Sequence, residues 1–399
     1  MARVFDDAGA PLFLVGGGVR NPLMGLPISD VDVCGPLLPQ DVCALCEGTA
    51  VEARVRAAGF GTVELWVDGH MAEYTAWREE SYTGGHRPDS VTFTTDIRVD
   101  ARRRDFSVNA LYRPLHDGWM EDVIDPTGGL RHLRLGVLHT TTRDPDAILS
   151  HDGQRILRAA RFQAEMDLRP TDALFASLKR NAPLIREVAM EQLRPEVEKI
   201  VMADLRYPAL RRRDPASRSG LRTLHLIGAW DDLFDGVSYD DTAALALSRT
   251  KGDLPRRMAL LMHRASPEKV QQAMQHMKFS TKLAAQAAEY VRVMHHLDAP
   301  IDELANPDAL QFAQSAFLAL GDSDGAEKAQ KALAALEGKP LSLKELALSG
   351  SDLKPLFEQA DRPLRELGPT LDRLWRMALR GEIGNEKNTL LEEVKKTGL

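Results

Sequence analysis

The chain has 399 residues, enough for several domains at roughly 100 to 200 residues each, and it carries 51 Lys and Arg against 58 Asp and Glu. The net charge of −7 excludes a uniformly basic coat for nucleic acid and leaves room for a local basic surface. No apolar run approaches the roughly 18 residues of a membrane span, so we expect no membrane association. The N-terminus lacks a secretory signal, which makes the cytoplasm the expected location.

Cysteine usage agrees with that location. Cys34, Cys43 and Cys46 are odd in number and confined to one short region, which favours reduced thiols over a disulfide framework. The pair Cys43 and Cys46 has zinc-like spacing, but a structural zinc site needs four ligands and no second pair exists. We interpret the pair as one turn of a buried helix.

The two parts of the chain differ in predicted secondary structure. The first 140 residues mix helical stretches with β-rich runs at 12–15, 62–67 and 70–77. From about residue 146 onward, long amphipathic segments predict helices throughout. Polar stretches at 211–220 and 321–325 interrupt them and predict domain boundaries.

A run of glycines follows the first predicted strand. The strand over 12–15 leads into Gly16, Gly17 and Gly18, and then into Arg20. Glycines let the backbone approach a polyphosphate closely, a helix that begins near Arg20 would add amide donors, and the arginine itself can bind phosphate through two hydrogen bonds. The pattern predicts a nucleotide site.

Two aspartates follow the glycine run. Asp30 and Asp32 stand two apart in a predicted strand, so both face one side and can hold divalent cations such as Mg²⁺. Two such ions would serve in-line displacement at phosphorus. The alternating segment 70–77 predicts a strand that can bring Glu73 beside the pair as a third carboxylate, and an exposed strand position explains Glu73 equally well.

The stretch RRRDFSVN at 102–109 comes next. Arg104 can donate to phosphate or ribose oxygens, and Asp105 can accept from a ribose hydroxyl, a contact that would favour ribonucleotides; Asn109 follows. Alone, such a stretch is usually a solvated group of charges. Its position after the Asp pair gives it weight.

The third pattern is HDGQRILRAARF, in which Asp152, Arg155, Arg158 and Arg161 recur every three residues. On one helix the first three would form the tighter group, and the repulsion between arginines favours an anion among them. An Asp and an Arg one turn apart can accept from an exocyclic amino group and donate to a ring nitrogen or carbonyl, which suits cytosine and adenine and disfavours uracil and guanine. A salt-bridged surface helix is the alternative.

Together and in this order, the three patterns resemble the class II tRNA nucleotidyltransferase and poly(A) polymerase family, whose motifs are GGxVRD with DxD, RRDF(T/S)xNA and EDxxR. The stretches here are GGGVRN at 16–21, RRDFSVNA at 103–110 and HDGQR at 151–155. Further similarity lies in IDPTGGLRHL, EQLRPEVEKI, LSGSDL and GEIGNEK, and it is patchier over about 205–340.

The resemblance implies an α+β, polymerase-β-like head over 1–145, followed by an all-α neck (146–215), body (216–320) and tail (321–399), with tRNA bound by the tail. It implies template-independent addition of C, C and A to the tRNA 3′ end from CTP and ATP, by a monomer or homodimer. Asp30 and Asp32 would bind Mg²⁺, with Glu73 as a third catalytic carboxylate. The residues implied to bind the nucleotide are Gly16, Gly17, Arg20, Arg104, Asp105, Asn109, Asp152, Arg155, Arg158 and Arg161.

Several alternatives stay open. The basic GRRF-type stretch of bacterial poly(A) polymerases is missing after the DxD, which favours tRNA as the substrate. The segment REESYTGGHRPDSV resembles the flexible loop of full CCA-adding enzymes, so complete addition leads over CC- or A-addition. A catalytically silent RNA-binding relative is the non-enzyme alternative, against which the intact Asp30 and Asp32 argue.

Three positions depart from the family pattern. Asn21, His151 and Gln192 replace Asp, Glu and Arg, which predicts altered efficiency and looser nucleotide selection rather than lost activity. His116-Asp117 and His151-Asp152 resemble the His-Asp pairs of metal phosphohydrolases, and we interpret both as accidental.

The charge is distributed unevenly. Residues 151–222 carry 15 Lys and Arg against 10 Asp and Glu, while the rest of the chain carries 36 against 48. A basic segment within an acidic chain is typical of a protein that binds one small RNA end and nucleotides locally.

Overall fold

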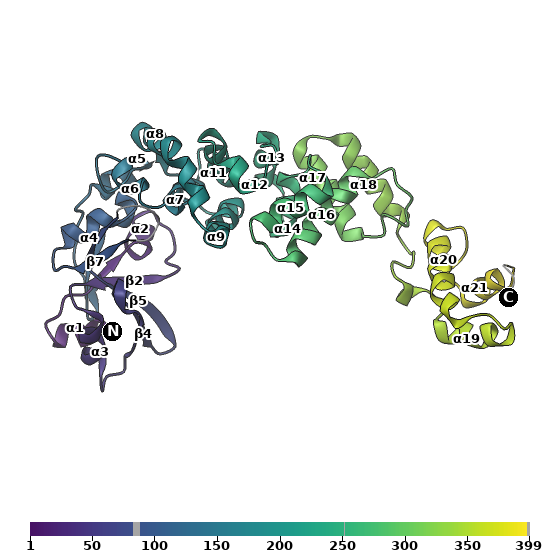
Figure 1. Cartoon of the computed structure of the whole chain (residues 1–399), viewed down its shortest axis with the longest axis horizontal. Helices are drawn as coiled ribbons and strands as arrows, with labels where there is room; N and C mark the ends of the chain where they lie inside the picture. Colours follow the sequence, from purple (N-terminus) through teal and green to yellow (C-terminus); the bar gives the residue numbers. More distant parts are fainter. Residues whose placement is uncertain (83–87, 251, 397–399) are drawn as a thin grey trace. The chain divides into compact units, whose positions relative to one another are not determined.

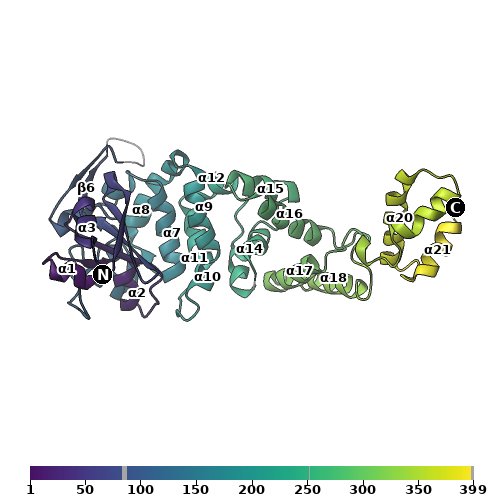
Figure 2. The same cartoon turned by 90° about the horizontal axis from the view of Figure 1, so that it is seen from below.

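The structure, a computed structural model, describes residues 1–82, 88–250 and 252–396, and Figures 1 and 2 show it from two sides. The chain divides into two compact units. The first comprises Met1–Ser248 and His276–Phe279, and the second comprises Arg249–Gln275 and Ser280–Leu399. The finer division into head, neck, body and tail stays a prediction, and we keep the words head and neck for residues 1–145 and 146–215.

A seven-stranded mixed sheet forms the framework of the head (Figure 1). Its strand order is β3-β4-β5-β2-β1-β8-β9; β2 and β5 run parallel, and the other neighbours pair antiparallel. The three strands predicted from the sequence are β1, β4 and β5, and the prediction is confirmed to within one residue at each end. The strands are β1 (Phe13–Val15), β2 (Val31–Gly35), β3 (Glu52–Ala57), β4 (Thr62–Val67), β5 (His70–Ala76), β8 (Tyr112–His116) and β9 (Trp119–Met120).

The pairing of β1 with β2 brings the first two sequence patterns together. Leu14 of β1 lies opposite Val33 of β2 in an antiparallel register. The carboxyl end of β1 therefore lies beside the start of β2. The glycine turn that follows Val15 is thus a neighbour of Asp32, although many residues separate them in the sequence.

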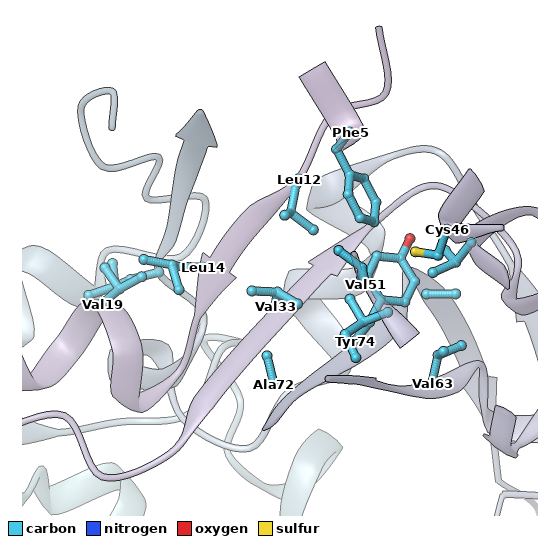
Figure 3. Packing of buried hydrophobic residues seen from close by; sticks show 14 residues of the cluster. Phe5, Leu12, Leu14, Val19, Val33, Cys46, Val51, Val63, Ala72 and Tyr74 are labelled. Carbon is cyan, nitrogen blue, oxygen red and sulfur yellow. The ribbon is translucent and has the colours of Figure 1, made fainter. Parts of the chain in front are cut away.

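A cluster of buried hydrophobic residues packs against the sheet of the head (Figure 3). Phe5 of α1 (Ala2–Asp7) packs against Tyr74 of β5 with ring centroids 6.1 Å apart, and both side chains are fully buried with Val33. Burying each such side chain contributes roughly 1.5 to 3 kcal/mol. The Tyr74 hydroxyl donates to the carbonyl of Leu37 at 2.9 Å, which satisfies its polar atom inside the core.

Short helices and a two-stranded arm complete the head. Helix α2 (Gly17–Leu23) follows β1, and α4 (Ile97–Arg103) precedes the RRRD stretch. The arm pairs β6 (Arg78–Ser81) with β7 (Ser90–Phe93) antiparallel. The other helices of the head are α3 (Pro39–Cys46) and α5 (Gly129–Leu135).

Helix α7 (Gln154–Met166) is the central element of the neck. It packs against α9 (Met190–Val201) and α11 (Ala216–Leu226), as Figure 2 shows. A Cβ on Gly220 would lie only 2.7 Å from the carbonyl oxygen of Ala160, so only glycine allows α11 to approach α7 this closely. The arginines of the third sequence pattern are therefore carried by a helix that is packed on two sides.

The expectation that every element after residue 146 is helical needs one correction. Strand β11 (Arg169–Pro170) follows α7 and pairs parallel with β10 (Val137–Leu138) of the head. The intervening Asp167 has a positive φ of 56°, which ends the helix and turns the chain toward the head. The short ladder therefore ties the start of the neck to the head.

The second unit consists of helices among its described residues. Gly321, in the left-handed conformation, ends one helix, and the Asp322 carboxylate caps the next, so the predicted boundary at 321–325 is a tight turn between packed helices. No helix in the described part of the chain is long and apolar enough to cross a membrane. The principal helices are α14 (Leu254–Leu261), α15 (Pro267–His276), α16 (Thr281–His295), α17 (Pro307–Leu320), α18 (Ser323–Ala335), α19 (Gly350–Gln359), α20 (Leu367–Arg380) and α21 (Lys387–Lys396).

Candidate active site

The glycine turn opens the site. Gly16 has a φ of +61°, a left-handed conformation that favours glycine. Helix α2 begins directly after it, at Gly17, which is earlier than the predicted start near Arg20. A Cβ on Gly16 would lie 3.6 Å from the Asp32 Oδ2, and a Cβ on Gly17 would lie 3.6 Å from the Arg20 Nη2. The two glycines therefore leave both functional groups uncovered.

Arg20 is buried, and its side chain donates to two neutral amide groups. Its Nε and Nη2 donate to the Asn21 Oδ1 at 3.2 and 2.9 Å, and its Nη1 donates to the Asn109 Oδ1. Both acceptors are neutral, and no carboxylate of the described residues pairs with it. Burial lowers the pKa of Arg20 to about 10, and the charges of Arg161 and Arg158 act in the same direction. A phosphate would supply the missing negative charge.

The carboxylate pair lies at the start of β2. Asp30 is exposed and precedes the strand, whereas Asp32 is half-buried within it. Burial raises the pKa of Asp32, and the neighbouring charge of Asp30 raises it further. A cation bound between the two carboxylates would remove this repulsion, and Mg²⁺ commonly binds one or two carboxylates together with substrate phosphates. The donor set therefore fits a divalent cation.

Glu73 lies next to Asp32 in the register of β2 and β5, which is one of the two placements that the sequence left open. Burial raises the pKa of Glu73, and the charge of Asp32 adds to that effect. Glu73 does not line the pocket described below. Within residues 1–82, 88–250 and 252–396, no three His, Cys, Asp or Glu side chains are grouped to hold a metal ion, so a catalytic role for Glu73 stays a prediction.

Asp100 binds the arginines of the RRRD stretch, and this residue was not identified from the sequence. Asp100 is fully buried and accepts hydrogen bonds from Arg103 Nε (2.8 Å), Arg104 Nε (3.0 Å) and the Tyr112 hydroxyl (2.7 Å). Burial would raise the pKa of Asp100, but the two guanidinium groups hold it at about 2. The interpretation of this stretch as a solvated group of charges is therefore wrong. The sequence does contain an indication of these ion pairs, because Arg103 and Arg104 follow Asp100 by three and four residues, the spacing of neighbours on one helix face.

Asp105 joins the head to the neck. Its Oδ2 accepts from Nε and Nη2 of Arg158 at 2.8 and 2.6 Å, and its Oδ1 accepts from the Asn109 amide and the Phe106 backbone at 2.9 and 2.7 Å. Burial would raise the pKa of Asp105, but Arg158 and Asn109 hold it at about 2. Since both oxygens already accept two hydrogen bonds, a ribose contact by Asp105 stays a prediction that requires these partners to move.

Asp152 does not share a helix with the arginines, contrary to prediction. Helix α7 begins at Gln154, and the Asp152 carboxylate accepts from the Gln154 backbone N–H at 2.9 Å. An Asp-Gly pair before an amphipathic run is a helix-start signal, which explains the difference. Asp152 still lies near Arg155, with 3.8 Å between its Oδ2 and the Arg155 Nε. Arg155 donates to the carbonyls of Ile148 and Arg103 at 2.9 and 3.3 Å, which fixes its orientation.

One pocket of about 550 Å³ collects these groups. Every predicted nucleotide-binding residue and both aspartates line it; Glu73 is the predicted site residue that does not. Arg161, predicted not to share a helix face with Asp152, also lines the pocket. The further lining residues, unrecognised from the sequence as site residues, are Asn21, Ser29, Arg103, Gln154, Phe162, Glu165, Met166, Lys199, Arg206 and Tyr207.

Phe162 organises three arginines within the pocket. The guanidinium carbons of Arg20, Arg158 and Arg161 lie 5.0, 5.8 and 4.9 Å from its ring centroid. Arg158 is compensated by Asp105, and Arg161 by Glu196, whose Oε2 lies 2.7 Å from the Arg161 Nε. The cationic groups are thus fixed in place before any ligand arrives, and Arg20 remains the one of the three without a carboxylate.

The departures from the family motifs have definite surroundings. His151 stacks on Tyr82 with ring centroids 4.5 Å apart and an interplanar angle of 5°. Asn21 is buried, and the Gln192 side chain is exposed, with its backbone carbonyl accepting from Gln154 at 3.4 Å. The segment predicted to be a flexible loop spans residues 78–91: its two ends form β6 and the start of β7, and its residues 83–87 lie outside the described residues.

The remaining expectations concern cysteines and His-Asp pairs. All three cysteines are free thiols, and Cys46 is buried on α3. His116 lies at the surface, where it contacts Asp6 and Glu121 at 2.9 and 3.1 Å. Cys43 and Cys46 both lie on α3, so the predicted helix turn is confirmed, although Cys43 is only partly buried.

Comparison with known proteins supplies the family. Residues 12–139 match the poly(A) polymerase head domain family. The chain is 27% identical to the CCA-adding enzyme of Levilactobacillus brevis, over 98% of this chain and 95% of that protein. The crystal structure of the Bacillus stearothermophilus CCA-adding enzyme in complex with CTP superposes with a TM-score of 0.76 at 23% identity, covering 99% and 96% of the two chains. The Thermotoga maritima CCA-adding enzyme complexed with tRNA superposes with a TM-score of 0.67 at 19% identity, covering 99% and 93%.

The α+β head, the glycine turn and the paired aspartates define a nucleotidyltransferase, and the predicted fold class is confirmed by these structures. The head, over residues 12–139, belongs to the poly(A) polymerase head domain family, and the chain as a whole is similar to CCA-adding enzymes. Enzymes of this family generally use divalent metal ions.

Proposed function

We propose that this protein adds C, C and A to the 3′ end of tRNA without a nucleic-acid template, using CTP and ATP. The observation that carries the proposal is the single pocket in which two aspartates, an uncompensated arginine and an Asp-Arg pair are collected. The relatives named CCA-adding enzymes, matched over nearly their whole length, support the same conclusion. The cytoplasm as its location and a monomer or homodimer as its assembly stay predictions.

The phosphates of the nucleotide would bind beside the glycine turn. Arg20 presents a guanidinium that has no carboxylate partner among the described residues, and Gly17 keeps the space beside it open. A charge-assisted contact to phosphate is stronger than a neutral hydrogen bond and is strengthened further in a buried site. This arrangement favours a polyanionic substrate over an uncharged nucleoside.

Asp30 and Asp32 would hold Mg²⁺. When bound there, the metal would stabilise the charge that develops on the α-phosphate as the tRNA 3′ hydroxyl attacks and pyrophosphate leaves. The protein fixes the position of Asp32, because β2 is paired on both sides within the sheet, whereas Asp30 directly precedes that strand. No covalent enzyme intermediate is required.

Asp152 and Arg155 would select the base. The carboxylate can accept from the exocyclic amino group of cytosine or adenine, and the guanidinium can donate to the adjacent ring nitrogen or carbonyl. Uracil and guanine present a ring N–H beside a carbonyl and would be disfavoured. The carbonyls of Ile148 and Arg103 hold the Arg155 guanidinium in one orientation, which such discrimination requires.

The test is an extension assay resolved at single-nucleotide length. Transcripts of one tRNA that end before CCA, after C and after CC are incubated with the protein and Mg²⁺, with each nucleotide offered singly and together. Growth to CCA followed by a stop is the expected result. A stop after CC would support partial addition, long A tails would support poly(A) polymerase activity, and no growth would favour a silent RNA-binding relative.

A further inference from the structure

A segment of the neck reaches into the pocket beside the head's chemical groups. Helix α10 (Ala203–Arg206) and the following Tyr207 lie where the similarity to family motifs is patchy. Both Arg206 and Tyr207 nevertheless line the pocket. Their contacts lead to the two groups on which the proposed chemistry depends.

Arg206 contacts Asp30 through a serine. Its Nη2 donates to the Ser29 Oγ at 3.1 Å, and the Ser29 Oγ donates to the Asp30 Oδ2 at 3.0 Å. A serine hydroxyl has one hydrogen, so the bond to Asp30 uses it and leaves a lone pair for the arginine. The guanidinium therefore fixes the direction in which the hydroxyl points, and with it one oxygen of Asp30.

Arg206 is itself held in place. Its Nε lies 3.7 Å from the Oε1 of Glu165, a carboxylate of α7 that is only 2% exposed, and its guanidinium carbon lies 5.7 Å from the Tyr207 ring centroid. Two contacts on the neck side thus orient a side chain that would otherwise have four free torsions. The loss of conformational entropy on ordering the Arg206 side chain therefore occurs before substrate binds.

Tyr207 is linked to Arg20 through the side chain of Asn21. Its hydroxyl, in a side chain that is 5% exposed, accepts from the Asn21 Nδ2 at 3.1 Å. The same amide donates to the Pro27 carbonyl at 2.8 Å, so the Asn21 oxygen is turned toward Arg20, which donates to it twice. The Asn21 amide both donates to the Pro27 carbonyl and accepts from Arg20, whereas an ionised aspartate at this position could not donate to Pro27.

We propose that Arg206 and Tyr207 are positioning residues, through which one segment of the neck orients Asp30 and Arg20 of the head. The inference rests on the proposed function, since it concerns the same site. Loss of Arg206 or Ser29 would misplace a metal-binding carboxylate, whereas loss of the Tyr207 hydroxyl would loosen the arginine that binds phosphate.

The test compares Arg206→Ala, Ser29→Ala, the double variant and Tyr207→Phe with the wild type. Arg186→Ala is the control, because Arg186 is an exposed neck arginine whose partner is Asp232. We expect Arg206→Ala and Ser29→Ala each to weaken Mn²⁺ binding, followed by the electron paramagnetic resonance of free Mn²⁺, by roughly tenfold. The double variant should be no weaker than the poorer single variant, because both act on one oxygen of Asp30.

Steady-state addition to tRNA separates the two residues. Arg206→Ala and Ser29→Ala should lower kcat with little change in the KM for CTP, and Tyr207→Phe should raise that KM. Additive losses in the double variant, or Mn²⁺ binding unchanged in both single variants, would overturn the inference. Ser29 is exposed, so Ser29→Ala retains the fold and decides the matter if Arg206→Ala does not fold. If the wild type binds Mn²⁺ but adds no nucleotide, the proposed function fails while the Mn²⁺ comparison still tests the positioning.

Discussion

Replacing Asp100 by Asn would test whether the RRRD stretch depends on one buried carboxylate. Asp100 is fully buried and faces Arg103, Arg104 and the Tyr112 hydroxyl at 2.7 to 3.0 Å. The substitution retains one acceptor oxygen and removes the charge, so Arg104 loses its carboxylate partner, whereas Arg103 keeps Glu80 at 3.3 Å. Breaking a buried ion pair in this way costs about 3 to 5 kcal/mol.

Calorimetry measures this loss directly. For a unit of this size, each kcal/mol shifts the Tm by roughly 2 to 4 °C, so we expect a transition about 10 °C lower at pH 7. The control is Asp122→Asn, which removes an exposed head carboxylate and should leave the Tm unchanged. A Tm for Asp100→Asn within a degree or so of the wild type would refute the reasoning.

The pH dependence provides a second check on Asp100. Its pKa of about 2 in the folded protein lies below the ordinary value of 3.8. The carboxylate therefore stabilises the fold above its unfolded pKa, by about 2 kcal/mol, and that contribution is lost as the pH falls through the folded pKa. The difference in Tm between the wild type and Asp100→Asn should shrink below about pH 4.

Three further predictions concern the pocket and the neck. Asp30→Ala or Asp32→Ala should lower nucleotide addition by at least about a hundredfold while equilibrium binding shows that CTP is still bound by Arg20; full activity in either variant would contradict the assigned role. Asp152→Ala and Arg155→Lys should each reduce the preference for CTP and ATP over UTP and GTP. Loss of a bidentate contact should lower this preference by roughly 5- to 100-fold, and the rate of single-nucleotide misincorporation measures the loss. Gly220→Ala should destabilise the first unit by about 1 to 3 kcal/mol in denaturant unfolding, because the added Cβ would lie 2.7 Å from the Ala160 carbonyl oxygen. Gly59→Ala is the control, because the Cβ added there would meet no side chain or distant backbone of the described residues within 4 Å.

Much of the head and its site could be predicted from local sequence patterns. The glycine turn, the Asp pair and the alternating strands depend on short-range preferences. The glycine turn lies near the Asp pair because β1 pairs antiparallel with β2. Asp152 and Arg155 are close because an Asp-Gly helix start places the aspartate directly before the first turn of α7. Here the prediction of proximity was right, although the assignment of Asp152 to the helix was wrong.

Other features depend on contacts between distant segments. Nothing near Asp105 in the sequence indicates that Arg158 would occupy its carboxylate. Arg206 and Tyr207 lie about 180 residues from the groups that they contact, as Ser29 and Asn21 show. Such pairs are set by the packing of the neck on the head, and a single sequence carries no periodic signal for them.

The most direct test of the central claim counts nucleotides and pyrophosphate together. A tRNA transcript that ends before CCA is incubated with the protein, Mg²⁺, CTP and ATP, beside the Asp30→Ala variant, and pyrophosphate is measured against the length of the product. The account predicts three nucleotides in the order C, C and A, three pyrophosphates per completed tRNA, then a stop, with neither product from the variant. An unextended transcript, a tail of many adenylates, or equal extension by the variant would contradict it.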